Sequence, residues 1–278
     1  MSQNGAPVLE IRQVGKTYGA GAKATKAIEN VSFTVADREF VCVVGPSGCG
    51  KTTLLKCVGG LLRPSNGEVL LRGKRVTAPP EEMGFVFQEY GRSLMPWLSV
   101  RKNVLLPLRH KSLGRRERRA LVEEALEAVG LTRFIDHYPW QLSGGMQQRV
   151  AIARALAYQP SILLMDEPFA SVDAQTRGDL EDLVLRVQEE FAVTIVFVTH
   201  DIDESVYLSD RVVVLTHAPT EVKEIIGVDL PFPRDQIRTK ELPEFTHLRG
   251  RVYRLIKREQ EDETEADEPV LEAVREGG

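Results

Sequence analysis

The stretch GPSGCGKTT at residues 45–53 limits what this chain can fold into more than any other. It fits the pattern G-x-x-x-x-G-K-[ST] and stands between a β-branched run and a helical pattern. In such a loop the glycines let backbone N–H groups turn toward phosphate, and the helix N-terminus adds its positive end. We therefore expect a nucleoside triphosphate site, with Lys51 at the β- and γ-phosphates and Thr52 at Mg²⁺. The expected contacts are Gly45, Pro46, Ser47, Gly48, Cys49, Gly50, Lys51, Thr52 and Thr53.

The rest of the chain alternates between strand and helix patterns. Short β-branched runs fill residues 8–44, a helical pattern covers 51–60, and buried-type strands return at ILLMD, VTIVFV and RVVVL. This alternation predicts an α/β fold with a largely parallel sheet that helices cover on both faces. Between about residues 89 and 159 the pattern is helical, so we expect a helical insertion into the α/β core.

Two adjacent carboxylates end the apolar strand ILLM at residues 162–165. Asp166 is suited to support Mg²⁺, while Glu167 points the other way and can polarise water for attack on the γ-phosphate. Alone, such a pair is more often a solvated strand end. The phosphate loop upstream favours the functional interpretation.

A second glycine turn, LSGGM, follows where the helical insertion ends. Ser143 can simply cap the next helix. Its hydroxyl, the amides of Gly144 and Gly145 and the helix N-terminus also make an anion site. Because one nucleotide needs only one phosphate loop, the pattern favours two chains paired head to tail, each closing the other's nucleotide.

Composition narrows the class of protein. The chain has 278 residues and a net charge of -4, which gives no support for nucleic acid as a partner. No apolar run approaches the roughly 18 residues of a membrane span, and the N-terminus does not read as a secretion signal. The three cysteines, Cys42, Cys49 and Cys57, suit a reducing compartment. Cys49 is expected to be a small filler in the loop rather than an oxidisable thiol.

In order and spacing, these motifs resemble the nucleotide-binding subunit of an ATP-binding cassette (ABC) transporter over roughly residues 8–218. GPSGCGKTT resembles the Walker A loop, ILLMD the Walker B strand with Glu167 as catalytic glutamate, and LSGGM the signature. The resemblance implies four further site residues. They are Tyr18 in KTYG, stacking on adenine; Gln88 in VFQE, sensing Mg²⁺ and facing the membrane partner; Asp173 in the D-loop SVD; and His200 in VTHD, contacting the γ-phosphate.

The resemblance also implies a P-loop NTPase core with an antiparallel β subdomain and an inserted α-helical subdomain. We expect the ATP-binding domain at residues 1–230, a helical extension at 231–260, and an acidic, disordered tail at 261–278. The implied cofactors are ATP and Mg²⁺, and the implied metal-site residues are Thr52, Gln88 and Asp166.

Three segments are similar to importer subunits of the nitrate/sulfonate/taurine type: LSGGMQQR, LMPW and VDLPFPR. Met146 replaces the glutamine that commonly ends the signature, and its thioether cannot donate the implied hydrogen bond. The implied partners are a second copy of the chain, multi-span permease subunits and, indirectly, a periplasmic or lipid-anchored solute-binding protein. The implied location is peripheral, on the cytoplasmic face of the cell membrane.

An exposed apolar cluster is expected where a coupling helix of the permease would dock; the alternative is internal packing within the helical insertion. The cluster consists of Leu94, Met95, Trp97 and Leu98.

Other ATPase classes explain the sequence less well. A soluble P-loop enzyme such as a nucleotide kinase leaves residues 143–145 and His200 without roles. A chromosome or DNA-repair ATPase needs a long coiled coil, which the short insertion lacks, and a translation factor carries two cassettes in one chain. The alternative function is that of a cassette ATPase with a regulatory role and no part in transport.

Overall fold

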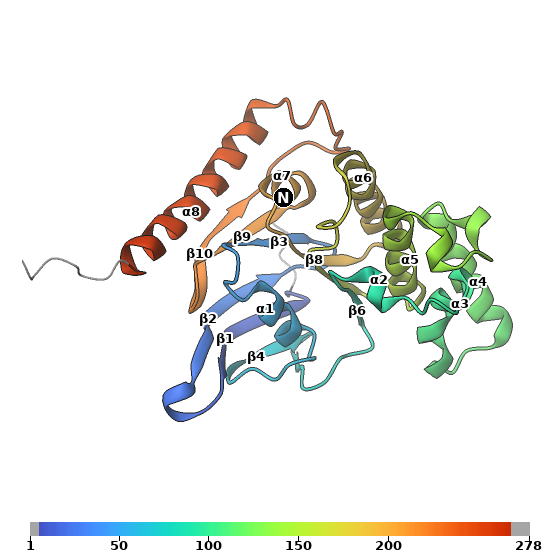
Figure 1. The fold of residues 1–278 in the computed structure, drawn as a ribbon, viewed down its shortest axis with the longest axis horizontal. Coiled ribbons are helices and arrows are strands. Elements are labelled where there is room, and N and C mark those ends of the chain that lie inside the picture. Colours follow the sequence, from blue (N-terminus) through green and yellow to red (C-terminus); the bar gives the residue numbers. More distant parts are fainter. Residues whose placement is uncertain (1–5, 268–278) are drawn as a thin grey trace, which may run out of the picture.

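One sheet of ten strands organises the computed structural model, which describes residues 6–267 (Figure 1). Across the sheet the order is β5-β4-β1-β2-β10-β9-β3-β8-β7-β6. The strands are β1 (Leu9–Tyr18), β2 (Thr25–Val35), β3 (Phe40–Val44), β4 (Asn66–Leu71), β5 (Lys74–Arg75), β6 (Met83–Val86), β7 (Ile162–Asp166), β8 (Thr194–Val198), β9 (Arg211–Leu215) and β10 (Thr220–Gly227).

The sheet has a parallel part and an antiparallel part. Strands β9, β3, β8, β7 and β6 run parallel to one another, whereas β5, β4, β1 and β2 pair antiparallel with one another. Strand β10 joins the two parts, because it is parallel to β2 and antiparallel to β9. The predicted α/β fold with an antiparallel β portion is therefore confirmed.

Helices cover the parallel part and fill the long connection between β6 and β7. They are α1 (Lys51–Val58), α2 (Tyr90–Ser93), α3 (Val100–Leu105), α4 (Arg115–Ala128), α5 (Gly144–Ala157), α6 (Ala174–Phe191), α7 (Ile202–Leu208) and α8 (Pro243–Asp267). Helices α2 to α5 lie together at one end of the sheet, at the right of Figure 1. In the part of the chain that the structure describes, no helix is both long and apolar enough to cross a membrane.

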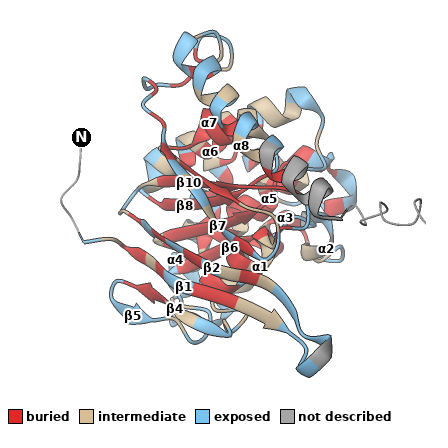
Figure 2. Ribbon diagram, turned by 90° about the vertical axis from the view of Figure 1, so that its left-hand side faces the viewer, coloured by how far each residue is buried: buried red, intermediate tan, exposed pale blue. Residues whose placement is uncertain are grey.

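Strand β3 separates two hydrophobic cores. Phe40, Cys42 and Val44 face a core built with α5, α6, α7 and α8, while Val41 and Val43 face a second core with α1 and the antiparallel strands. Because successive side chains of a strand point to opposite faces, β3 must be apolar along its whole length. Figure 2 shows these strands as a stack of buried ribbon.

The C-terminal segment differs from expectation. Helix α8 does not end near residue 260 but continues to Asp267, into the stretch that was expected to be a disordered tail. Phe245 and Val252 anchor it in the first core, where they are 3% and 0% exposed. Apolar burial at one end thus supports a helix whose acidic composition alone predicts disorder. Residues 268–278 of the expected tail lie outside the described residues.

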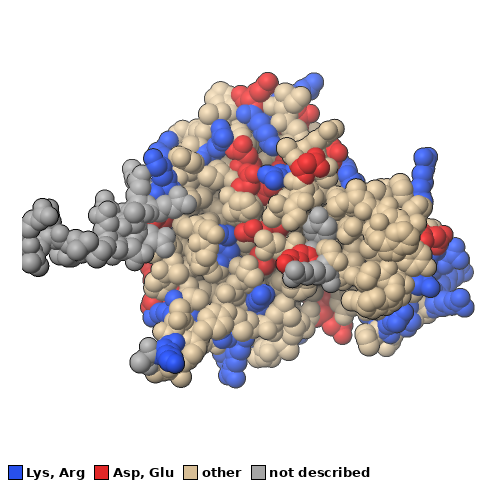
Figure 3. Space-filling view, in the orientation of Figure 1, with Lys and Arg blue, Asp and Glu red and all other residues tan. Residues whose placement is uncertain are grey.

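Charge is unevenly distributed over the surface. Residues 101–120 carry eight Lys and Arg against one Glu, in a chain whose net charge is -4. Figure 3 shows Lys and Arg side chains gathered on the helical region at the right. The net charge of the chain is therefore negative although the surface of this region is basic.

Candidate functional site

The loop between β3 and α1 lines a pocket of about 620 Å³. Eight of the nine residues predicted for the loop line it, and buried Cys49 does not. Glu167, His200 and Ile256 complete the lining. Burial raises the pKa of the Cys49 thiol, in agreement with its expected role as a small packed residue.

Glycine is required in this loop by backbone conformation. Gly48 has φ +77° and Gly50 has φ +96°, values in the left-handed region that side chains disfavour. A Cβ on Gly48 would meet no atom within 4 Å, so open space faces this part of the loop. The loop therefore leaves room for phosphate groups on this side.

Lys51 and Thr52 begin α1 beneath the pocket. Lys51 is only 6% exposed, and its Nζ donates to the carbonyl oxygens of Gly45 and Pro46, both at 2.9 Å. Thr52 Oγ1 donates to Oδ1 of Asp166 at 3.0 Å. Burial raises the pKa of Asp166, and the hydrogen bond from Thr52 offsets part of that effect.

The hydroxyl and carboxylate oxygens of Thr52 and Asp166 are donors that suit Mg²⁺. Among the described residues, no three or more His, Cys, Asp or Glu side chains group together as a metal cage. Mg²⁺ commonly takes one or two protein ligands and completes its shell with phosphate oxygens and water. The donor set therefore fits a metal that binds together with a nucleotide.

Gln88, Glu167 and His200 converge beside the loop. Glu167 Oε2 lies 3.0 Å from Nδ1 of His200 and accepts from Nε2 of Gln88 at 3.3 Å. These residues follow three neighbouring parallel strands, β6, β7 and β8, at their carboxyl ends. Crevices at that edge of a parallel sheet are the usual ligand sites of α/β proteins.

The backbone of Glu167 is strained. Its φ is +42°, and its N–H donates to the carbonyl oxygen of Val198 at 2.8 Å. A non-glycine residue in this conformation costs about 1–3 kcal/mol and commonly marks a functional site. The neighbouring strand holds Glu167 in a geometry that turns its carboxylate toward His200.

Tyr18 lies next to the same loop. Its hydroxyl is 3.3 Å from Oγ1 of Thr53, and its side chain is 43% exposed. The ammonium of Lys16 lies 5.4 Å from the ring centroid. The exposed aromatic ring thus lies beside Thr53, a residue of the pocket lining.

The second glycine turn does not reach the pocket within one chain. Ser143 caps α5 by accepting from the N–H of Met146 at 3.3 Å. Asp173 caps α6 by accepting hydrogen bonds from the N–H and hydroxyl of Thr176, which lower the pKa of its carboxyl. None of Ser143, Gly144, Gly145 and Asp173 is in the pocket lining.

The expected exposed cluster at residues 94–98 is partly wrong. Leu94 is 2% exposed and packs in the helical part of the first core, and Met95 and Leu98 are half-buried. The Asn103 side chain fixes this turn by bonding the backbone of Met95 and Leu98. Trp97 remains 70% exposed. Of the four residues expected to form an exposed apolar cluster, only Trp97 is exposed.

One residue of the pocket lining was not predicted from the sequence. Ile256 belongs to α8, some two hundred residues beyond the phosphate loop. Only the packing of α8 across β9 and α7 brings it to the pocket. No sequence motif or hydrophobic periodicity predicts a contact between a C-terminal helix and a loop so far away in the chain.

Comparisons with known proteins agree with this geometry. Residues 28–170 match the family model described as ABC transporter. The nitrate import ATP-binding protein NrtC of Synechococcus elongatus is 43% identical, over 91% of this chain and 38% of that protein. The aliphatic sulfonates import ATP-binding protein SsuB of Bacillus thuringiensis subsp. konkukian is also 43% identical, over 86% of this chain and 96% of that protein.

A solved structure of similar shape is the dimeric, post-hydrolysis state of the ATP-binding cassette MJ0796 bound to ADP and Pi. It is 36% identical with a TM-score of 0.69, covering 79% of this chain and 98% of that one.

Proposed function

This chain belongs to the ABC transporter family, and we propose that it is the ATP-hydrolysing subunit of an importer whose membrane-spanning subunits are separate chains. The observation that carries the proposal is that Glu167 and His200 line the phosphate-loop pocket in contact with one another, and that Gln88 donates to the same Glu167. A single loop would serve many nucleotide enzymes, whereas these three side chains together suit hydrolysis of a terminal phosphate.

We assign the roles around the nucleotide from position. The backbone of residues 45–50 would hold the phosphates, with Lys51 turning from the loop carbonyls to the β- and γ-phosphates. Tyr18 would stack on the base. Thr52, Asp166 and Gln88 would hold Mg²⁺, which would neutralise charge on the phosphates.

For hydrolysis, Glu167 would accept a hydrogen bond from the attacking water. Its carboxylate lies at the pocket wall, where Oε2 contacts both Gln88 and His200. His200, which lines the same pocket, would contact the γ-phosphate. These residues orient the water and stabilise charge that develops on the phosphate.

A second copy of the chain would complete each site. Ser143, Gly144 and Gly145 start a helix but do not reach this chain's own pocket, so they are free to close the pocket of a partner. Asp173 would lie beside them at the same junction. Support comes from the dimeric cassette of similar fold that was captured with ADP and Pi.

The membrane partner would be a multi-span permease that docks near Gln88 and Trp97. This would place the chain at the cytoplasmic face of the membrane, as a peripheral subunit. A periplasmic or lipid-anchored binding protein would deliver the solute. The two relatives share 43% identity with this chain and are named for different solutes, so we propose the nitrate/sulfonate/taurine class and not one member.

The shared-site mechanism predicts the behaviour of Glu167→Gln. The amide keeps the size of the side chain but removes the charge that activates water, so hydrolysis stops after ATP binds. We expect the variant to accumulate as a dimer with MgATP, measured by light scattering, and to be monomeric without nucleotide. The matched control is Lys51→Ala, which should stay monomeric under both conditions. A Glu167→Gln protein that remains monomeric at saturating MgATP would contradict the mechanism.

The transport role is tested by reconstitution. Tagged protein purified gently from its own cells should bring a multi-span membrane protein with it. ATP hydrolysis by that assembly should rise with one solute of the proposed class, presented with its binding protein. Recovery of soluble partners alone would instead favour a regulatory cassette.

A further inference from the structure

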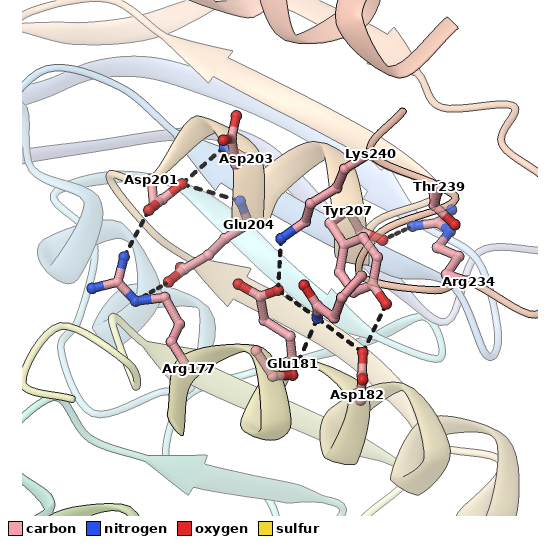
Figure 4. A network of polar contacts seen from close by, with 12 residues as sticks. Arg177, Glu181, Asp182, Asp201, Asp203, Glu204, Tyr207, Arg234, Thr239 and Lys240 are labelled. Atoms are coloured by element: carbon pink, nitrogen blue, oxygen red, sulfur yellow. Dashed lines mark hydrogen bonds and ion pairs between the residues drawn. The ribbon is translucent and has the colours of Figure 1, made fainter. Parts of the chain in front are cut away.

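Arg177 lies between the first turns of α6 and α7 (Figure 4). Its Nη1 donates to Oδ2 of Asp201 at 2.9 Å, and its Nε lies 3.5 Å from Oε1 of Glu204. The Glu204 side chain is 5% exposed and that of Arg177 is 31% exposed. The guanidinium thus joins the start of α6 to Asp201, which caps α7, and to Glu204 within α7. The Glu204 end of this contact is buried, while Arg177 and Asp201 are partly exposed.

The two carboxylates control the backbone on both sides of His200. Asp201 follows the histidine and caps α7 by accepting from the N–H groups of Asp203 and Glu204. Glu204 accepts from Oγ1 of Thr199 at 2.6 Å, and the same Oγ1 accepts from the N–H of Asp201 at 2.9 Å. Thr199 and Asp201 are therefore tied to one another and, through the carboxylates, to Arg177.

His200 depends on this support. Its side chain is 60% exposed, and within the described chain its ring has a hydrogen-bond contact to one side chain, Glu167. A ring with so little packing of its own takes its position from the backbone that carries it. Whatever fixes residues 199–201 therefore fixes the distance between His200 and Glu167.

We propose that Arg177 is a positioning residue for ATP hydrolysis, which holds His200 against Glu167 by clamping Asp201 and Glu204. The proposal rests on the function proposed above. Arg177 lies one turn after Asp173, and its N–H donates to the carbonyl oxygen of Asp173 at 2.9 Å. The clamp thus connects the capping turn of α6 to the histidine that faces the phosphate pocket.

The chain supplies a matched control one turn further along α6. Nζ of Lys240 lies 3.3 Å from Oε2 of Glu181, with side-chain exposures of 29% and 3%. This pair has nearly the burial of the Arg177–Glu204 pair, but it ties α6 to the segment after β10 (Figure 4). Lys240→Gln therefore removes a comparable ion pair without touching the backbone around His200.

The experiment compares Arg177→Gln, Arg177→Lys and Lys240→Gln in the full chain, by steady-state ATP hydrolysis, ATP affinity and thermal unfolding. We expect Arg177→Gln to lower kcat by about 10- to 100-fold, because small displacements of a catalytic group are this costly. Its affinity for ATP should stay within about twofold, since the phosphate loop is untouched. Arg177→Lys should recover part of kcat, and Lys240→Gln should keep the wild-type kcat.

A double variant tests whether Arg177 acts through His200. In a His200→Ala background, Arg177→Gln should cause little further loss of kcat, since there is no ring left to position. Equal losses in Arg177→Gln and Lys240→Gln, or losses that multiply in the double variant, would overturn the proposal. A wild-type chain that does not hydrolyse ATP would instead refute the proposed function, before any variant is compared.

Discussion

Gly145 and Thr176 illustrate how a signature residue can be constrained by its own chain. A Cβ added to Gly145 would lie 2.3 Å from Cγ2 of Thr176, across the junction of α5 and α6. Thr176 cannot easily turn away, because its hydroxyl donates to Asp173 at 2.7 Å. The glycine is therefore required for packing inside the chain, independently of any contact to a partner's nucleotide.

This contact predicts the result of two substitutions. Gly145→Ala should destabilise the fold by about 1–3 kcal/mol through overpacking, although alanine favours a helix. Thr176→Ser removes the clashing methyl and keeps the hydroxyl, so the double variant should recover the lost stability in chemical denaturation. If ATP hydrolysis stays low in that stable double variant, Gly145 also serves the nucleotide. Full recovery of hydrolysis would limit Gly145 to a role in folding.

At the scale of elements, α7 carries a buried acid directly behind the site. Burial raises the pKa of Glu204 to about 7, with Asp201 and Glu181 adding to the effect and Thr199 and Arg177 opposing it. In the unfolded chain the pKa returns to about 4.3. The folded protein thus holds this proton more tightly, and Glu204 contributes stability below about pH 4.3 that is lost as pH rises to about 7.

Glu204→Gln tests this linkage. Glutamine has no proton to lose, so the free energy of unfolding of the variant, relative to wild type, should increase from pH 5 to pH 8. A pKa difference of this size corresponds to a gain of roughly 4 kcal/mol at most. Denaturant titrations of both proteins at each pH provide the measurement. Parallel pH profiles would show that the pKa of Glu204 is the same in the folded and unfolded protein, which would contradict the prediction.

At the scale of the molecule, the helical region exposes Trp97 on a turn that is held in place by contacts inside that region. Buried Leu94 and the Asn103 hydrogen bonds hold the turn, while the indole is 70% exposed. Such an exposed aromatic on a fixed backbone is typical of the centre of a protein interface. Trp97 follows Gln88 closely in the sequence, so a partner bound at Trp97 can affect Gln88 and, through it, the phosphate site.

Trp97→Ala separates folding from assembly. Because the side chain is largely solvated, we expect unfolding free energy to change by no more than about 0.5 kcal/mol and hydrolysis by the isolated chain to be unchanged. Stimulation by the permease should fall by about tenfold or more. Trp140, which is 71% exposed on the same helical region, provides the control: Trp140→Ala should leave stimulation intact. Equal effects of both substitutions would exclude a specific permease contact at Trp97.

Sequence alone determined the features that depend on consecutive residues. The phosphate loop, the strand that ends at Asp166 and the cap at Ser143 are local, because backbone conformation and periodicity are set by near neighbours. The alternation of strands and helices was enough for the α/β class. The family resemblance added Gln88 and His200, which the structure brings to Glu167.

Only the tertiary structure decided which distant side chains meet. It buried Leu94, carried α8 to Asp267, brought Ile256 to the pocket, and placed Arg177 between Asp201 and Glu204. Each of these outcomes depends on how elements pack, and packing joins residues whose spacing in the chain follows no period. Local propensity therefore predicts an element and its ends. The contacts between distant side chains are decided by the packing free energy of the two hydrophobic cores, which is gained only when the whole chain folds.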